Sequence, residues 1–139
     1  MQTACVFCKI AQGQLPSTRI FEDRQSLAFM DIAPIIKGHA LVIPREHYDP
    51  ITALPESLLQ HLIVVARQVA RAQIDGLQAD GVNIMQANGA AAGQVVPHVH
   101  FHVIPRYADD GHRWNWKTVK YDTPAEMQAL AEKLRKSLI

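Results

Sequence analysis

The chain has 139 residues, of which 48% are hydrophobic and 19% charged, and its formal net charge at pH 7 is +1. This length suits one domain with one sizeable core, and the composition is that of a soluble globular protein. Because the net charge is near zero and the basic residues are scattered, we expect no nucleic-acid partner and no membrane surface. The N-terminus lacks a basic region followed by an apolar run, which predicts no signal peptide and a cytoplasmic location.

The strands expected from the sequence are short apolar runs bounded by turn residues. They lie at residues 20–21, 27–32, 39–44, 82–87 and about 94–104. The third run is almost wholly apolar, so we expect a central strand that is buried on both faces. Pro44 marks its end.

One long helix is predicted to open at Pro55, because its apolar residues recur at spacings of three and four. The apolar face is formed by Leu58, Leu62, Val65 and Val69, and the polar face by Gln60, Arg67, Gln68 and Arg71. Gly76 is the expected end of this helix, and His61 is expected on its exposed side.

A second helix is predicted at residues 127–138, because Thr123 to Glu126 forms a capping box with proline at the first helical position. Five strands, interspersed turns and one central helix predict a single α+β domain over residues 1–139 with a mainly antiparallel sheet. Its C-terminal helical tail is expected from about residue 108.

Three histidines alternate with apolar residues in the run His98-Val99-His100-Phe101-His102. In an extended chain this period places all three imidazoles on one face and the apolar side chains on the other. The first and last histidines would lie about 13 Å apart at the backbone, too far for one metal ion with bonds of about 2 Å. We therefore expect the histidines to divide between different roles, including nucleophilic and acid–base chemistry.

The glycine-bearing loop 88–93 precedes this run, and its backbone N–H groups would suit phosphate oxygens. It lacks the Gly-Lys-Ser/Thr ending of a P-loop and leads into an extended segment, so neither a P-loop nor a Rossmann turn is expected. No organic cofactor is predicted.

The pair Cys5-x-x-Cys8 has three interpretations: half of a structural zinc site, a redox pair, or two buried small residues. No thioredoxin-like context surrounds it, which makes redox activity the weakest of the three. A zinc site would need two more ligands.

Together these motifs resemble the histidine-triad (HIT) family of nucleotide hydrolases and transferases, in particular its bacterial Hint-like, CxxC-containing members. The resemblance spans about residues 5–107. It includes the histidine run, the CxxC segment and the segments 28–32, 38–44 and 92–96. A HIT-like fold is implied, with a five-stranded antiparallel sheet, one long central helix and a C-terminal helix.

The resemblance implies that His100 is the nucleophile, which attacks the α-phosphorus of a purine nucleotide conjugate and forms a nucleotidyl-histidine intermediate that water hydrolyses. His102 and His39 match positions that line the phosphate pocket, and His98 belongs to the same catalytic run. Asp31 matches the carboxylate that holds the ribose hydroxyls. The implied base-binding wall is Phe7, Ile10, Phe29 and Ile32, and the implied phosphate-binding residues are Asn88, Gly93, Gln94 and Val95.

The resemblance also implies that His47 and His98 complete a structural zinc site with Cys5 and Cys8. The substrate would be a nucleoside phosphoramidate, a dinucleoside polyphosphate or a related adenylate. A homodimer is implied, with two sheets joined edge to edge.

Two positions depart from the family pattern. Many members have a polar residue where this chain has Ala87, and the Hint-like branch has a proton-donating serine where it has Val95. The alternative function is therefore a non-catalytic, zinc-stabilised nucleotide-binding or interaction module. The segment around His112, Trp114 and Trp116 is expected to be either a packed loop or a specificity or dimer-interface segment.

Overall fold

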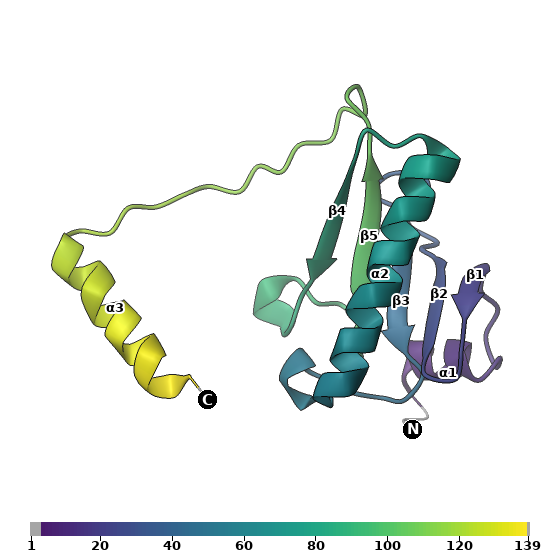
Figure 1. The fold of residues 1–139 in the computed structure, drawn as a ribbon, viewed down its shortest axis with the longest axis horizontal. Helices are drawn as coiled ribbons and strands as arrows, with labels where there is room; N and C mark the ends of the chain where they lie inside the picture. The colour runs from purple at the N-terminus through teal and green to yellow at the C-terminus, as the bar shows by residue number, and fades with distance from the viewer. Residues whose placement is uncertain (1–3, 139) are drawn as a thin grey trace.

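An antiparallel sheet of five strands carries the histidine run (Figure 1). The computed structural model describes residues 4–138. The prediction of a domain over residues 1–139 and the prediction about a signal peptide therefore both include terminal residues outside the described range. The strands, in the order β1-β2-β3-β5-β4, are β1 (Arg19–Glu22), β2 (Ser26–Met30), β3 (Ala40–Pro44), β4 (Gly81–Gln86) and β5 (Phe101–Arg106). The helices are α1 (Val6–Ala11), α2 (Glu56–Leu77) and α3 (Pro124–Ser137), with 3-10 turns at Ile51–Ala53 and Ala90–Ala92. The predicted α+β architecture is confirmed.

The strand β3 occupies the middle of the sheet. All five of its residues are buried, because β2 and β5 flank it and both faces are covered. Leu41 stands opposite His102 of β5, and Ala28 of β2 stands opposite Val42. The prediction of a central, doubly buried strand is confirmed.

Helix α2 covers one face of the sheet (Figure 1). Its predicted apolar stripe is buried against the sheet, and Leu62 is fully buried. From the sheet side, Val99, Phe101 and Val103 join this core. Burying each large apolar side chain stabilises the fold by about 1.5–3 kcal/mol, so this layer fixes the position of β5.

Part of the opposite face of the sheet is covered by α1, which packs on residues of β2 and β3 and forms a smaller core with them (Figure 1). Cys5 is the N-cap of α1, and its sulfur accepts from the N–H of Cys8 at 3.5 Å. Phe7 packs edge-on against Phe29 of β2, with ring centroids 5.7 Å apart. The two cysteines are therefore held beside the sheet at the first turn of a short helix.

Several predicted boundaries were wrong. β5 begins at Phe101 and not near residue 94, because Phe101 is the first residue to pair with β3 and β4, whereas the N–H of Val99 bonds to the carbonyl of Tyr48. Gly76 does not end α2, which continues to Leu77 and is capped by Gln78 in the left-handed conformation, at φ 56°.

His61 was expected to be solvated on the exposed side of α2, and this was wrong. The ring is half-buried, and its Nε2 lies 2.7 Å from a carboxylate oxygen of Asp23 in the turn between β1 and β2. That carboxylate also accepts from the backbone N–H of Ser26 at 2.7 Å. The helix is thus fastened to the β1–β2 turn by a polar contact that helical periodicity does not reveal.

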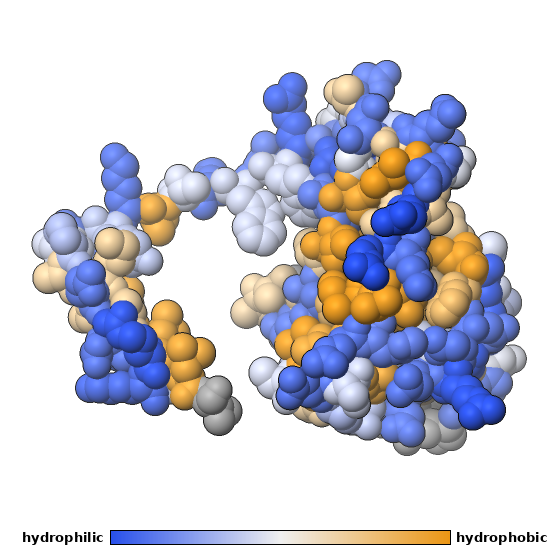
Figure 2. Space-filling model, viewed as in Figure 1, coloured by the Kyte–Doolittle hydropathy of each residue, from blue (hydrophilic) through white to orange (hydrophobic). Residues whose placement is uncertain are grey.

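The C-terminal part of the described chain leaves the sheet as an extended arm, and α3 stands apart from the domain (Figure 1). Thr123 caps α3 as predicted, since its Oγ1 accepts from the N–H of Glu126 at 3.1 Å. Figure 2 shows apolar surface along one side of α3, and its exposed apolar side chains are Met127, Leu130, Leu134 and Leu138. Within residues 4–138, no helix combines the length and the apolar character that crossing a membrane requires.

Candidate functional site

The alternation of side chains around β5 places the three histidines on the face away from α2. His98, Val99 and His100 precede the strand, yet their side chains still alternate between the two faces of the sheet. Val99 belongs to the core under α2, whereas the ring edge of Phe7 from α1 contacts the rings of His98 and His100. His98, His100 and His102 therefore meet the layer that contains α1.

A cleft of about 590 Å³ opens on this face. Nine of the predicted site residues line it: Phe7, Ile10, Phe29, Asp31, Ile32, Gly93, Val95, His100 and His102. Its remaining lining residues were missed by the sequence analysis: Val6, Leu15, Pro16, Ser17, Met30, Ala33, Leu41 and Val96. Most of these are apolar neighbours of predicted residues, and no chemistry in their side chains could have singled them out.

The ring of His100 is held by the backbone carbonyl of His98, two residues earlier in the chain. Its Nδ1 lies 2.7 Å from the carbonyl oxygen of His98, which can only accept, so Nδ1 carries the proton and donates it. The Nε2 atom of neutral His100 then has a free lone pair. The ring is only 6% exposed, and this burial lowers the pKa of His100, which favours the neutral form.

His102 contacts His39, which is almost fully buried beside it. The His102 Nδ1 and His39 Nε2 atoms are 2.9 Å apart, and an oxygen of Asp31 lies 3.6 Å from the same His39 nitrogen. Burial, with the neighbouring His100 and His39, lowers the pKa of His102 to about 4. His39 does not line the cleft but stands behind His102.

The two cysteines meet two histidines in a second cluster. The ligand atoms of Cys5, Cys8, His47 and His98 all lie within 4.8 Å of one another. Cys5 Sγ is 3.4 Å and Cys8 Sγ is 3.6 Å from Nδ1 of His98, and Cys8 Sγ is 3.4 Å from Nδ1 of His47. The four predicted metal ligands are therefore brought together in space.

Two predicted phosphate-binding side chains are engaged elsewhere. Asn88 accepts from the N–H of Ile51 at 2.8 Å, and Gln94 donates to a carboxylate oxygen of Asp49 at 2.7 Å. Gln94 also accepts from the N–H of Gly89 at 2.6 Å. Both side chains brace the glycine loop. The loop also holds itself together, because the N–H groups of Ala92, Gly93 and Gln94 donate to loop carbonyls at 3.0–3.2 Å.

The cleft is open at two predicted residues. Val95 is 90% exposed and Ile32 is 99% exposed, although both line it. Val95 occupies the position of a proton-donating serine in the resembling branch, and its side chain has no proton to donate.

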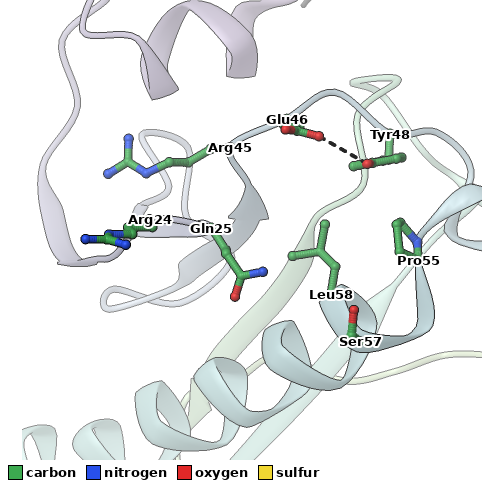
Figure 3. Close-up of a pocket in the computed structure, with 8 residues that line it drawn as sticks. All are labelled: Arg24, Gln25, Arg45, Glu46, Tyr48, Pro55, Ser57 and Leu58. Atoms are coloured by element: carbon green, nitrogen blue, oxygen red, sulfur yellow. Dashed lines mark hydrogen bonds between the residues drawn. The ribbon is translucent and has the colours of Figure 1, made fainter.

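A second hollow, of about 200 Å³, lies between the β1–β2 turn and the start of α2 (Figure 3). Two of its polar side chains, those of Arg45 and Tyr48, are already hydrogen-bonded within the described chain. The Arg45 guanidinium donates to the carbonyls of Asp23 and Ala11, and the Tyr48 hydroxyl donates to Glu46. This hollow brings together no group of nucleophilic or metal-ligating side chains, so the functional site is the histidine cleft.

The family comparison agrees with this assignment. The family model described as HIT domain matches residues 12–109. The chain is 39% identical over 136 residues to Protein hit of Bacillus subtilis, covering 96% of this chain and 94% of that protein. It is 38% identical over 132 residues to adenosine 5'-monophosphoramidase hnt1 of Schizosaccharomyces pombe, covering 94% and 96%. The fold and the histidine cleft are those of a histidine-triad protein. The family match and these relatives show that the chain belongs to the HIT family.

Solved structures give the same result. A HIT family member from Bacillus subtilis superposes with a TM-score of 0.90 at 38% identity, covering 98% of each chain. A zinc-bound histidine triad family protein from Mycobacterium smegmatis superposes with a TM-score of 0.76 at 36% identity, covering 97% of this chain and 98% of that one. The predicted HIT-like fold is confirmed.

The buried position of His102 predicts an unusual titration. In an unfolded chain its pKa would be the ordinary 6.5, whereas the folded value is about 4. Between these values the unfolded state takes up a proton that the folded state does not, so stability falls as pH drops from 6.5 toward 4. We expect the His102 ring to titrate near pH 4 in an NMR titration, and the His102→Gln variant to lose less stability over this range. A midpoint at or above 6.5 would contradict the burial argument.

Proposed function

We propose that the protein is a nucleotide hydrolase or nucleotidyl transferase that cleaves at the α-phosphate of a purine nucleotide conjugate. The observation that carries this is the free Nε2 lone pair of His100, created by the Nδ1 hydrogen bond to the His98 carbonyl, in a cleft with apolar walls. The similarity to a fungal protein named adenosine 5'-monophosphoramidase supports a nucleotide substrate. The substrate class is a nucleoside phosphoramidate or a dinucleoside polyphosphate.

The reaction follows from the state of His100. Its Nε2 attacks the α-phosphorus, an N–P bond forms, and the bond from phosphorus to the leaving group breaks with the electron pair going to the leaving group. The leaving group takes up a proton from solvent water, and the water that hydrolyses the intermediate later returns one proton to the solvent. Water attacks the nucleotidyl-His100 intermediate, the N–P bond breaks, and the nucleotide and the neutral imidazole are regenerated.

The remaining predicted residues supply binding. Phe7, Ile10, Phe29 and Ile32 form the apolar wall for the base, while Asp31 holds the ribose hydroxyls. One oxygen of Asp31 accepts from the N–H of Ala33 at 2.8 Å, which fixes the carboxylate and leaves the other oxygen for the sugar. The phosphates would meet His102 and the loop formed by Asn88, Gly93, Gln94 and Val95, of which Gly93 and Val95 line the cleft.

Removing the nucleophile tests the proposal. Because no other group would take the place of the His100 Nε2 atom, His100→Ala is expected to reduce AMP release from an adenosine phosphoramidate by about 10³-fold or more. The control is Gln60→Ala, on the exposed polar face of α2 and outside the cleft, which should leave the rate unchanged. AMP release is measured with purified full-length protein.

Equal background-level release from the wild type and His100→Ala would contradict the enzyme proposal. If both proteins nevertheless bind AMP, the alternative of a non-catalytic nucleotide-binding module gains support. The alternative is supported by Val95, which is exposed at the position where the Hint-like branch has a proton-donating serine.

We also propose that Cys5, Cys8, His47 and His98 hold a structural zinc ion. Tetrahedral zinc with bonds of about 2.3 Å to sulfur and 2.05 Å to nitrogen separates such ligands by about 3.6 Å. The separations of 3.4–3.6 Å between the sulfur and nitrogen atoms in the structure fit this value. His98 points Nδ1 at the sulfurs while its Nε2 donates to the carbonyl of Pro44 at 2.9 Å, which is the arrangement typical of a ligating histidine. The zinc-bound structural neighbour supports the same assignment.

Metal analysis tests this site. We expect about one zinc ion per chain in the wild type, because a structural site binds tightly. His47→Ala should lose the metal and lower the melting temperature, whereas the control Gln60→Ala, at an exposed position of α2, should keep both unchanged. Absence of zinc from wild-type protein purified without chelators would overturn the metal proposal without affecting the role of His100.

We propose further that two copies of the chain pair along β4. This strand is an edge of the sheet, and a long exposed edge is normally covered in a stable protein. Helix α3, with 14 residues, is too short to be stable alone, yet its apolar stripe is exposed. A second copy would supply a surface for both.

Sedimentation velocity tests the pairing. The wild type is expected to sediment as a dimer. The double variant Leu130→Gln and Leu134→Gln should dissociate more readily, because it removes apolar area from α3. The control Gln128→Ala, on the same helix, should behave as the wild type. A monomeric wild type at tens of micromolar would contradict the proposal.

A further inference from the structure

His39 is held by a backbone group that can only donate. The N–H of Ile35 points at Nδ1 of His39, with the two nitrogens 3.1 Å apart. A neutral imidazole has one donor nitrogen and one acceptor nitrogen, so the acceptor here is Nδ1. The proton of neutral His39 therefore sits on Nε2.

The proton on His39 determines the proton on His102. His39 Nε2 is 2.9 Å from Nδ1 of His102, which must accept this hydrogen bond. Neutral His102 then carries its own proton on Nε2. The ring lines the cleft, so this N–H is its remaining polar group for a ligand.

We propose that His39 is a positioning residue: the Ile35 amide fixes its tautomer, and His39 in turn fixes His102 as an Nε2–H hydrogen-bond donor. For the part that concerns the substrate, this rests on the proposed function, since the acceptor would be an oxygen of the nucleotide phosphate. His39 itself lies outside the cleft lining and acts through His102. The two rings form a relay that begins at a main-chain amide.

Burial keeps His39 in the neutral state that the relay needs. The side chain is 1% exposed, and burial lowers the pKa of His39 although the nearby Asp31 opposes this. A charged His39 would place a proton on Nδ1, facing the proton of the Ile35 amide. The Asp31 oxygen, at 3.6 Å from Nε2, is farther away than the His102 nitrogen and competes weakly for its proton.

The loop between β2 and β3 presents the amide in the correct place. Asp31 accepts from the N–H of Ala33 at 2.8 Å, and the N–H of His39 donates to the carbonyl of Ile36 at 2.9 Å. These two bonds turn the chain back on itself. As a result, Ile35 faces the ring of a residue only four positions later.

Two clusters of side chains are close enough to hold a metal, and the hydrogen bonds of their histidines distinguish them. Asp31, His39 and His102 also place ligand atoms within 4.8 Å of one another. A ligating histidine normally donates its second nitrogen to an acceptor, as His98 does to the Pro44 carbonyl. The second nitrogen of His39 faces a donor instead, so this cluster is a hydrogen-bond relay and not a metal site.

NMR of histidine-labelled full-length protein tests the relay without any substrate. Long-range proton–nitrogen correlations distinguish a protonated ring nitrogen from an unprotonated one. At pH 7 we expect both His39 and His102 as neutral rings with the proton on Nε2. A proton on Nδ1 of either ring overturns the proposal. His100→Ala should keep both tautomers while losing AMP release, so failure of the proposed enzyme activity is distinguishable from failure of the relay.

Two conservative variants of His39 separate positioning from a merely structural role. The side-chain amide nitrogen introduced by His39→Gln can reach the place of Nε2 and donate to His102, whereas the shorter side chain of His39→Asn can only satisfy the Ile35 amide. His39→Asn is expected to lower kcat on the order of tenfold, the size of one hydrogen bond, with little change in KM. His39→Gln should restore most of this loss and keep the Nε2–H tautomer of His102. Equal loss in both variants, with the His102 tautomer unchanged, overturns the relay.

Discussion

The placement of the histidines depends on packing on the other side of the chain. Val99, Phe101 and Val103 are buried under α2, and because side chains alternate, the residues between them must face the opposite layer. Reversing this register would expose three apolar side chains and bury the imidazoles under the helix, at a cost of several kcal/mol. The hydrophobic core therefore orients the site.

Main-chain groups then give each imidazole a different chemical state. The carbonyl of Pro44 accepts from His98 and turns its other nitrogen toward the cysteines, while the carbonyl of His98 accepts from His100 and frees Nε2. The amide of Ile35 does the reverse for His39 by donating to it. Three side chains of one type thus acquire the states suited to a metal ligand, a nucleophile and a donor without any change of residue.

Much of this arrangement could be predicted from the sequence, because alternation and apolar runs are local patterns. The α+β class and the buried β3 were expected from these patterns, whereas the grouping of Cys5, Cys8, His47 and His98 was expected only from the resemblance to the HIT family. The start of β5 was not, because it depends on which strands lie opposite Phe101. The contact of His61 with Asp23 and the Ile35 relay escaped prediction for the same reason, since each needs a loop whose conformation is set by tertiary contacts.

In the proposed mechanism, His100 forms a covalent bond to the nucleotide through Nε2. The most direct measurement is mass spectrometry with peptide mapping of wild-type protein mixed with an adenosine phosphoramidate and quenched in alkali, because phosphoramidate bonds are labile in acid. We expect an adenylyl group on His100 alone, which disappears as AMP accumulates. An adduct on His98 or His102, or AMP release in which no adduct forms at any time, would contradict it.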